Sequence, residues 1–333
     1  ERQAVLWRDP PTQQEVATMW WSRKAASADK TTKETAEPNR NVEEDRKEEV
    51  DPWSESEVQF IQEYWELSDQ EKKDFNELHK KLSDVDHWKN CPDTVVRFMR
   101  ARPGNVDAAE TLFRNMIAWR KENDVDNILE TYSPPDVLRD YYPGAILQGR
   151  DSDDDPVYVG RLGVTDAVGL LERCGREELI RHAIWVREFV SRGEWMSEYK
   201  KEMGRPVKRI TIIEDLSGLS SRLLSRPVLN LYGEIMRLDQ DNYCESAKRL
   251  IMIRAPALFR LAWSITKHWF DAGVVLKMVF SGPHNYLEVL DQYMDRKILP
   301  PSICPEEGKG KVLDGFSDNF DGGLVPKEES SEK

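Results

Sequence analysis

Few cysteines and no long hydrophobic run occur in this 333-residue sequence, and both features exclude classes of protein. The four cysteines are Cys91, Cys174, Cys244 and Cys304, and the nearest two are 60 residues apart (304 − 244). This spacing excludes a zinc ribbon and a dense disulfide framework, so we expect a reducing compartment. No apolar run approaches the roughly 20 residues that a transmembrane helix needs.

Catalytic signatures are absent as well. The sequence has no GxSxG, GxxxxGK[ST] or HExxH motif, and no GxGxxG motif between a strand and a helix. Its histidines show no metal-ligand spacing, and the segment 308–311, although rich in glycine and lysine, follows prolines rather than a strand. We therefore predict a protein that is not an enzyme and has no catalytic residue, metal site or cofactor.

Positive charge is also in short supply. Lys and Arg number 48 against 61 Asp and Glu, which gives a net charge of −13. This balance excludes a nucleic-acid-binding protein with a broad basic face, and loose adsorption of the whole surface to anionic membranes. The balance does not exclude a local basic patch on the surface.

The first part of the chain is predicted to be an extension, residues 1–52. Within it, residues 12–26 form a candidate helix that either lies at a membrane interface or, as the preferred interpretation, packs on the main body. Residues 41–51 have almost no apolar side chains to offset their ordering entropy, so we predict a disordered acidic linker. Because the chain begins with Glu1 rather than Met, we expect a processed product from which any targeting signal is gone.

Two different periodicities follow. Residues 53–131 carry apolar side chains at helical spacing and predict a small all-helical module. Residues 132–305 alternate between strands and helices, which predicts an α/β lobe with a mixed, mostly parallel sheet covered by helices. Residues 306–333 are predicted to be a C-terminal tail. The helices of the module are expected at 57–66, 70–82, about 94–102 and 105–121; the strands of the lobe at 156–162, 208–216, 250–253 and 275–280; and its helices at 177–203, 223–239, 257–270 and 286–294.

Five local motifs occur in the order typical of one family. They are Val96–Arg102 with a helix ending at Trp119-Arg120, Gly149–Tyr158, Ile212–Leu219, Arg254–Phe259 with Trp263 and Lys267, and Leu299-Pro300. Over residues 93–305 the sequence thereby resembles the CRAL-TRIO lipid-binding proteins, which include the phosphatidylinositol exchange proteins and α-tocopherol transfer protein. It is most similar to the subgroup related to supernatant protein factor. There, a segment like Gly322–Lys327 leads into a β-sandwich (GOLD) domain, which we expect to be missing or removed here.

The resemblance implies that one lipid is enclosed in an apolar cavity between the sheet and a gate helix at 257–270. The alternative for the apolar stripe of this helix is ordinary core packing. A pocket of roughly several hundred Å3 is expected, as is usual for ligand sites. The residues predicted to form the cavity and its gate are Ile210, Ile212, Glu214, Phe259, Ala262, Trp263, Ile265, Trp269, Phe270 and Val274.

Strand alternation places Ile210, Ile212 and Glu214 on one face. Phosphatidylcholine-binding members have two small hydroxyl residues where Ile210 and Ile212 stand, so the resemblance implies a more apolar wall here. Glu214 is either a carboxylate of the cavity or, as the preferred interpretation, a residue at the solvent-exposed end of the strand.

The resemblance also implies a site for a phosphoinositide headgroup, formed by Arg102, Glu245 and Lys277. Three positions depart from the family pattern: Pro103 replaces a basic residue, Cys244 replaces proline and Val274 replaces threonine. Two cations remain to bind a phosphate. The alternative is that Lys277 pairs with Glu245 and only stabilises the fold.

Two functions follow as hypotheses. The first is a cytoplasmic, peripherally membrane-associated protein that holds one phosphoinositide or isoprenoid-like hydrophobe and exchanges it with membranes. The second is a protein-interaction module with a vestigial pocket and unknown protein partners. Nucleic acid is not expected as a partner of either.

Overall fold

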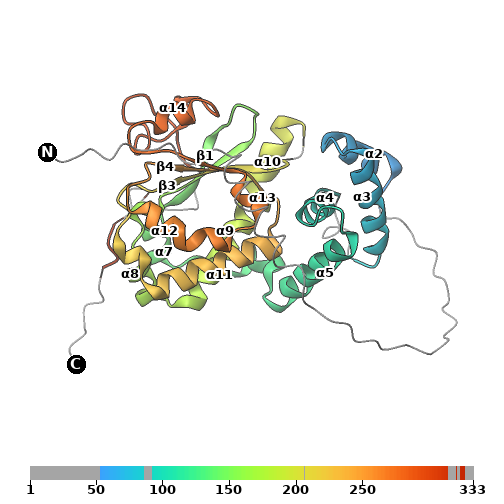
Figure 1. Ribbon diagram of the computed structural model, residues 1–333, viewed down its shortest axis with the longest axis horizontal. Helices are drawn as coiled ribbons and strands as arrows, with labels where there is room; N and C mark the ends of the chain where they lie inside the picture. The colour runs from blue at the N-terminus through green and yellow to red at the C-terminus, as the bar shows by residue number, and fades with distance from the viewer. Residues whose placement is uncertain (1–52, 86–91, 206, 314–319, 321–322, 327–333) are drawn as a thin grey trace.

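The computed structural model describes residues 53–85, 92–205, 207–313, 320 and 323–326. The extension 1–52, with its predicted helix and acidic linker, and most of the predicted tail lie outside the described residues. In Figure 1 a helical module stands on one side and a larger lobe built on a sheet on the other. The predicted boundaries between these parts stay predictions.

The helical module contains four helices, α2 (Glu55–Tyr64), α3 (Asp69–Lys81), α4 (Pro92–Ala101) and α5 (Val106–Glu122). Two of them begin with a capping box: Ser54 pairs with Glu57, and Ser68 with Glu71, so that orphan backbone N–H groups find side-chain acceptors. These helices begin and end within two residues of the predicted ones. Their apolar faces meet in one core, which includes Trp65, Phe75, Leu78, Phe98 and Phe113.

The sheet of the lobe has five strands in the described residues, in the order β1-β2-β3-β4-β5. They are β1 (Gly144–Arg150), β2 (Pro156–Gly160), β3 (Ile210–Asp215), β4 (Ala247–Ile253) and β5 (Met278–Phe280). The pair β1 and β2 is antiparallel, and every later pair is parallel. The predicted mixed, mostly parallel sheet is therefore confirmed.

Helices cover both faces of this sheet (Figure 1). Helix α14 lies on one side, over a core that includes Ile213, Ile251 and Leu290. Helices α9, α11 and α12 lie on the other side, at a distance that leaves room for a cavity. After α5, the helices and short 3-10 turns are η1 (Val125–Asn127), α6 (Ile128–Thr131), α7 (Asp136–Tyr141), η2 (Leu162–Val164), α8 (Ala167–Cys174), α9 (Arg176–Arg192), α10 (Glu194–Met203), η3 (Ser221–Leu224), α11 (Arg226–Asn242), α12 (Phe259–Thr266), η4 (Lys267–Trp269), α13 (Ala272–Val275), α14 (Tyr286–Leu290) and η5 (Arg296–Ile298).

The predicted elements and the structure differ in several places. The single helix expected at 177–203 is two helices, because the chain turns at Gly193, where a Cβ would lie 2.6 Å from the carbonyl oxygen of Phe189. The strand expected at 275–280 is shorter, since Ala272–Val275 forms a helical turn before β5. Strand β1 was not predicted, because its two glycines lower its strand propensity.

None of the helices in the described ranges combines the length and the hydropathy that crossing a bilayer requires.

Candidate ligand-binding cavity

A cavity of about 1170 Å3 lies between the sheet and helices α9, α11 and α12, and it extends into the cleft between the lobe and helix α4. It is larger than the several hundred Å3 expected, because both parts of the molecule contribute to it. Its walls include Phe98 and Met116 from the module, Ile210, Ile212 and Leu250 from the sheet, and Tyr232, Trp263 and Phe270 from the covering helices.

The structure places most of the predicted wall residues along this cavity. Ile210, Ile212 and Glu214 line it from β3, Phe259, Ala262 and Trp263 from α12, and Trp269, Phe270 and Val274 from the segment that follows.

Ile265 is the exception, and its prediction is corrected. Its side chain is 40% exposed, and Leu261, one turn earlier, is 54% exposed. Helix α12 faces the cavity with Phe259, Ala262, Trp263 and Thr266, the i, i+3, i+4, i+7 positions of one helix face. Leu261 and Ile265 lie on the opposite face, so the apolar stripe is split between the cavity and the surface.

An aromatic cluster, formed by Phe259, Trp263, Phe270 and Phe280, lies where α12 contacts the sheet and the segment that follows the helix. The ring of Trp263 lies 5.1 Å from that of Phe280, 5.8 Å from that of Phe270 and 6.3 Å from that of Phe259, measured between centroids. The segment after α12 is tied to α11 by Gln240, whose amide donates to the carbonyl of Trp269 at 2.6 Å and accepts from the N–H of Asp271 at 2.8 Å.

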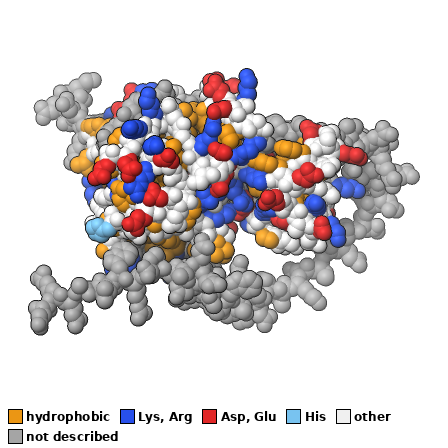
Figure 2. Space-filling view, turned by 90° about the horizontal axis from the view of Figure 1, so that it is seen from above, with side chains coloured by type: hydrophobic (Ala, Val, Ile, Leu, Met, Phe, Trp, Pro, Cys, Tyr) orange, Lys and Arg blue, Asp and Glu red, His pale blue; other side chains and the backbone are white. Residues whose placement is uncertain are grey.

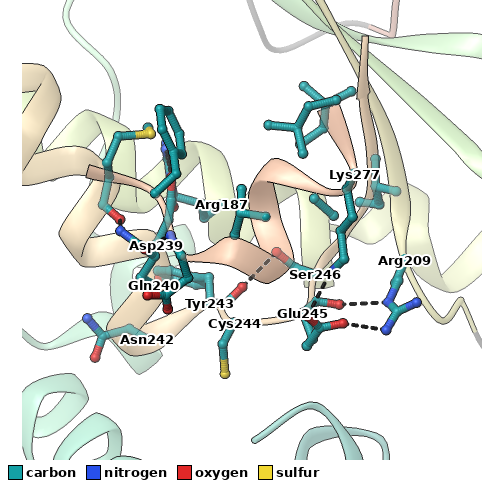
Figure 3. Close-up of a pocket in the computed structure, with 18 of the residues that line it drawn as sticks. Arg187, Arg209, Asp239, Gln240, Asn242, Tyr243, Cys244, Glu245, Ser246 and Lys277 are labelled. Atoms are coloured by element: carbon teal, nitrogen blue, oxygen red, sulfur yellow. Dashed lines mark hydrogen bonds and ion pairs between the residues drawn. The ribbon is translucent and has the colours of Figure 1, made fainter. Parts of the chain in front are cut away.

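A cluster of cations stands at the mouth of the cavity. Lys277 donates to Glu245 at 2.6 Å, and the guanidinium of Arg209 pairs with the other oxygen of the same carboxylate (Figure 3). Burial lowers the pKa of Lys277 and that of Arg209, because both cations are partly removed from water. Glu245 adopts a left-handed backbone conformation with φ of 57°, which a non-glycine residue rarely adopts.

Two further arginines line the cavity from the helical module, Arg97 on α4 and Arg102 directly after it. Arg102 donates to the neighbouring carbonyl of Ala101 at 2.7 Å, and Arg97 donates to the carbonyl of Val207 at 3.2 Å. The Nε of Arg97 is buried and has no hydrogen-bond partner among the described residues. Figure 2 shows Lys and Arg side chains gathered in the cleft between lobe and module, despite the acidic balance of the whole chain. We call Arg97, Arg102, Arg209 and Lys277 the basic mouth.

The sequence did not predict Arg97 and Arg209. Strand alternation assigns Arg209 to the face opposite Ile210, but the strand begins only at Ile210 and its register with β4 shifts there. Arg97 belongs to the same quoted motif as Arg102, and its sequence position alone does not say that it contacts Val207, 110 residues away.

The preferred prediction for Glu214 was wrong. Its side chain lines the cavity rather than the solvent, and burial raises the pKa of its carboxyl to about 7, with Arg187 opposing and Asp215 adding to that rise. The strand does not end in solvent here, since the described residues of α9 and α11 cover this end of the sheet.

Comparison with known proteins agrees with this architecture. Residues 140–303 match the CRAL/TRIO domain. This lobe belongs to the CRAL-TRIO family. The family resemblance seen in the sequence is thereby confirmed, and the CRAL-TRIO lobe is a lipid-binding domain.

Several relatives share this CRAL-TRIO lobe. Protein real-time of Drosophila pseudoobscura pseudoobscura is 33% identical over 266 residues, which are 79% of this chain and 38% of that protein. A CRAL-TRIO domain-containing protein of Caenorhabditis elegans is 30% identical over 208 residues, 62% of this chain and 28% of that protein. The chain thus spans less than two-fifths of the length of these relatives. The fold is similar to the crystal structure of Sfh5, with a TM-score of 0.55 and 15% identity over 80% of this chain and 94% of that chain.

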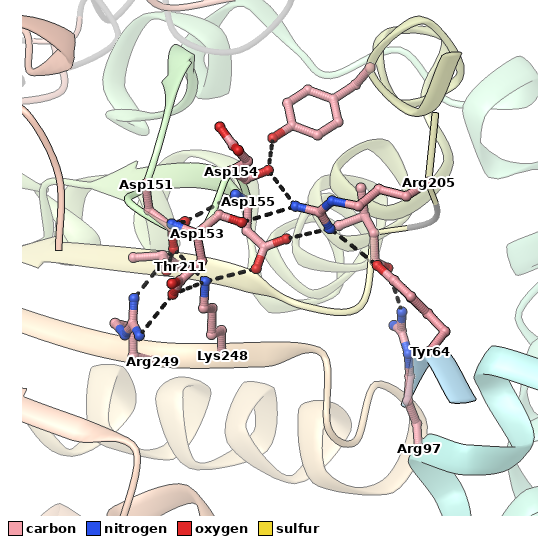
Figure 4. A network of polar contacts seen from close by, with 12 residues as sticks. Tyr64, Arg97, Asp151, Asp153, Asp154, Asp155, Arg205, Thr211, Lys248 and Arg249 are labelled. Carbon is pink, nitrogen blue, oxygen red and sulfur yellow. Dashed lines mark hydrogen bonds and ion pairs between the residues drawn. The ribbon is translucent and has the colours of Figure 1, made fainter. Parts of the chain in front are cut away.

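The loop between β1 and β2 of the CRAL-TRIO lobe carries four aspartates, and Figure 4 shows the cations that pair with three of them, Asp151, Asp153 and Asp155. Lys248 contacts Asp151 at 2.9 Å and Asp155 at 2.7 Å. Arg205 contacts Asp155 at 3.1 Å and also the hydroxyl of Tyr64, in the helical module, at 3.1 Å. This network connects the two parts of the molecule beside the mouth. No group of three or more His, Cys, Asp or Glu in the described part of the chain is arranged to hold a metal ion.

Proposed function

We propose that this protein binds one phosphoinositide, with its hydrocarbon in the cavity and its phosphorylated headgroup at the basic mouth, and exchanges it with membranes. One observation carries the proposal: the apolar cavity of about 1170 Å3 is lined by Arg97 and Arg102 from the helical module and by Arg209 and Lys277 from the lobe.

The apolar walls supply the affinity for hydrocarbon. Each Å2 of apolar surface that the lipid removes from water contributes about 25 cal/mol, so a chain enclosed by Ile212, Trp263 and Phe270 is held without any polar contact. Such burial does not distinguish one hydrophobe from another, and selection has to come from polar groups.

The mouth supplies that selection. A phosphate accepts short, charge-assisted hydrogen bonds from Lys and Arg, and these bonds are about twice as strong as neutral ones. Glu245 holds Lys277 and Arg209 beside each other and thereby keeps both ammonium and guanidinium groups aimed at the cleft. A phosphate then competes with Glu245 for the two cations.

Replacing Lys277 tests the headgroup site. We expect Lys277→Ala to weaken binding of phosphatidylinositol 4-phosphate by about 10- to 100-fold, because a hydrogen bond to a charged group contributes roughly 1.5–3 kcal/mol. Arg102→Ala should act in the same direction with a smaller effect. Binding of squalene should not change, because this neutral hydrocarbon forms no hydrogen bond or ion pair with Lys277. Lys121→Ala, at an exposed lysine of α5, serves as the matched control.

Equal losses for the charged and the neutral ligand, or no loss for either, would show that Lys277 stabilises the fold only. Native mass spectrometry of the purified protein tests the broader proposal, because a lipid-binding protein carries a bound lipid mass, whereas an interaction module with a vestigial pocket does not. A peripheral membrane contact in the cytoplasm, and the absence of catalysis and of a cofactor, stay predictions.

A further inference from the structure

A second polar group of residues lines the cavity at the end opposite the basic mouth. It consists of Glu214, the hydroxyls of Tyr142, Tyr158 and Tyr232, and Arg187; we call it the inner cluster. Glu214 lies four residues after Ile210 on β3, about 13 Å along the strand from Ile210, whereas Arg209 directly precedes the strand. Figure 3 shows Arg187 and Asp239 apart from the group formed by Lys277, Glu245 and Arg209.

The sheet leaves space for this cluster at two glycines. Gly160 pairs with Glu214 across β2 and β3, and a Cβ at Gly160 would lie 2.5 Å from one carboxyl oxygen and 2.6 Å from the other. Gly144 pairs with Gly160 across β1 and β2, and a Cβ there would overlap the hydroxyl of Tyr158. Any larger residue at either position would displace a polar side chain that now faces the cavity.

The carboxyl of Glu214 is not satisfied by the protein. Its side chain is half-buried along the cavity, and none of the described residues forms a hydrogen bond with either carboxyl oxygen. A carboxyl that is partly removed from water without a hydrogen bond is costly. Arg187 is close enough to act on Glu214, but its guanidinium is held by Asp239 at 2.8 Å and by the carbonyl of Ala183 at 3.0 Å. The hydrogen-bonding capacity of Glu214 is therefore directed at the contents of the cavity.

The groups around Glu214 come from every element packed against it. Tyr158 belongs to β2, Asp215 to β3, Arg187 to α9 and Tyr232 to α11, while Tyr142 follows α7. Burial raises the pKa of each of these three tyrosines, so their hydroxyls stay protonated and can donate. The cluster thus offers both an acceptor and donors at one place.

We propose that the inner cluster is a binding site for the hydroxyl group of a lipid alcohol, whose hydrocarbon lies along the wall formed by Ile210 and Ile212. A hydroxyl donates to Glu214 and accepts from a tyrosine, so it satisfies both kinds of group at once. A phosphoinositide brings only hydrocarbon to this end, and a fatty acid brings a second carboxylate, which repels the first. This inference rests on one part of the proposed function, namely that the cavity holds the hydrocarbon of a lipid.

Three ligands of equal chain length test this site: tetradecanol, tetradecanoic acid and tetradecane. Their affinities for the whole chain are measured at pH 8 by displacement of diphenylhexatriene, a fluorescent hydrocarbon. For each ligand, the affinity of each variant is compared with that of the wild-type protein. We expect Glu214→Met to lower the affinity for tetradecanol about 10-fold and to raise the affinity for tetradecanoate by a similar factor. The affinity for tetradecane should stay within about twofold of the wild-type value. Glu172→Gln, at an exposed carboxyl of α8, is the matched control.

Two further variants keep the proposal testable if Glu214→Met does not fold. Glu214→Gln keeps a hydrogen-bond acceptor but removes the charge. It should therefore raise the affinity for tetradecanoate, while the affinity for tetradecanol stays within about threefold of the wild-type value. Tyr232→Phe removes one donor and should weaken tetradecanol alone. A uniform change for all three ligands would overturn the inner site and leave the proposed function standing. Failure of every ligand to displace the probe would overturn both.

Discussion

Glu214 is a single side chain whose burial couples folding to pH. In the folded protein its pKa is raised from 4.5 to about 7, chiefly because burial disfavours the charged form. Between these values the folded state keeps a proton that the unfolded state has lost, so stability falls as the pH rises. Above about pH 7 the group is ionised in both states and the loss is complete.

Comparing Glu214→Gln with the wild type isolates this effect. The shift of about 2.5 (7 − 4.5) corresponds to about 3 kcal/mol, so the variant should gain up to that much relative to the wild type between pH 4.5 and pH 8. Urea unfolding of both proteins at pH 4.5 and pH 8 measures the difference. A difference that does not change with pH would show that the carboxyl reaches water in the folded protein.

Single residues also show how far the sequence predicts this site. The alternation of β3 correctly places Ile210, Ile212 and Glu214 on one face, because a strand has a fixed period of two. The same rule fails for Arg209, which precedes the regular strand. Whether Glu214 meets solvent depends on which helices cover that end of the sheet, and a local pattern does not contain this information.

Helix α12 is the element that separates the cavity from the surroundings. Its inner face carries Phe259 and Trp263, and its outer face carries Leu261 and Ile265, both exposed. The apolar stripe predicted a helix that packs on one side. It did not predict that apolar residues on the other side stay uncovered, because periodicity records which residues are apolar and not what covers them.

Trp263→Ala tests the inner face of α12. The ring is only half-buried, so its removal should destabilise the fold by less than the roughly 3–5 kcal/mol typical of a core aromatic residue. Release of bound lipid to acceptor vesicles should become faster, since the ring lines the cavity. Urea unfolding and a vesicle transfer assay measure the two effects. A full loss of 3–5 kcal/mol with unchanged transfer would identify Trp263 as core.

Ile265→Ser tests the outer face. An exposed side chain contributes within about 0.5 kcal/mol to stability, so the variant should fold normally. If α12 contacts the membrane during exchange, binding to phosphatidylcholine vesicles should fall several-fold, because an apolar contact with the bilayer is lost. Leu324→Ser changes an even more exposed apolar residue outside α12 and should have no effect. Equal behaviour of both variants in a vesicle flotation assay would exclude this contact.

The molecule as a whole builds the basic mouth from two parts that are distant in the sequence. Arg97 and Arg102 come from the helical module, whereas Arg209 and Lys277 come from the CRAL-TRIO lobe. Cys244 of the lobe packs into the core of the module. The sequence predicts each part from its own periodicity and caps, but the contact between them depends on side chains that meet only after folding. The cleft, and with it two of the four cations, could not be predicted.

The position of the module should therefore control headgroup binding. The hydroxyl of Tyr64 on α2 bonds to Arg205 of the lobe at 3.1 Å, and Tyr64→Phe removes that bond while keeping the ring, which Lys208 contacts 4.2 Å from its centroid. Loss of one hydrogen bond to a charged group weakens docking by roughly 1.5–3 kcal/mol, so binding of phosphatidylinositol 4-phosphate should fall by up to about 10- to 100-fold while squalene binding stays unchanged. Hydrogen exchange should rise in the module more than in the sheet.

Tyr132→Phe is the matched control for this prediction. The hydroxyl of Tyr132 donates to Glu178 at 2.7 Å, and both residues belong to the lobe. Its removal should lower the free energy of unfolding by a similar amount, since one hydrogen bond to a charged group is lost in each case. It leaves the module in place, so headgroup binding should stay unchanged. If both variants weakened headgroup binding equally, the effect would follow stability alone, and the module would not position Arg97 and Arg102 for the phosphate.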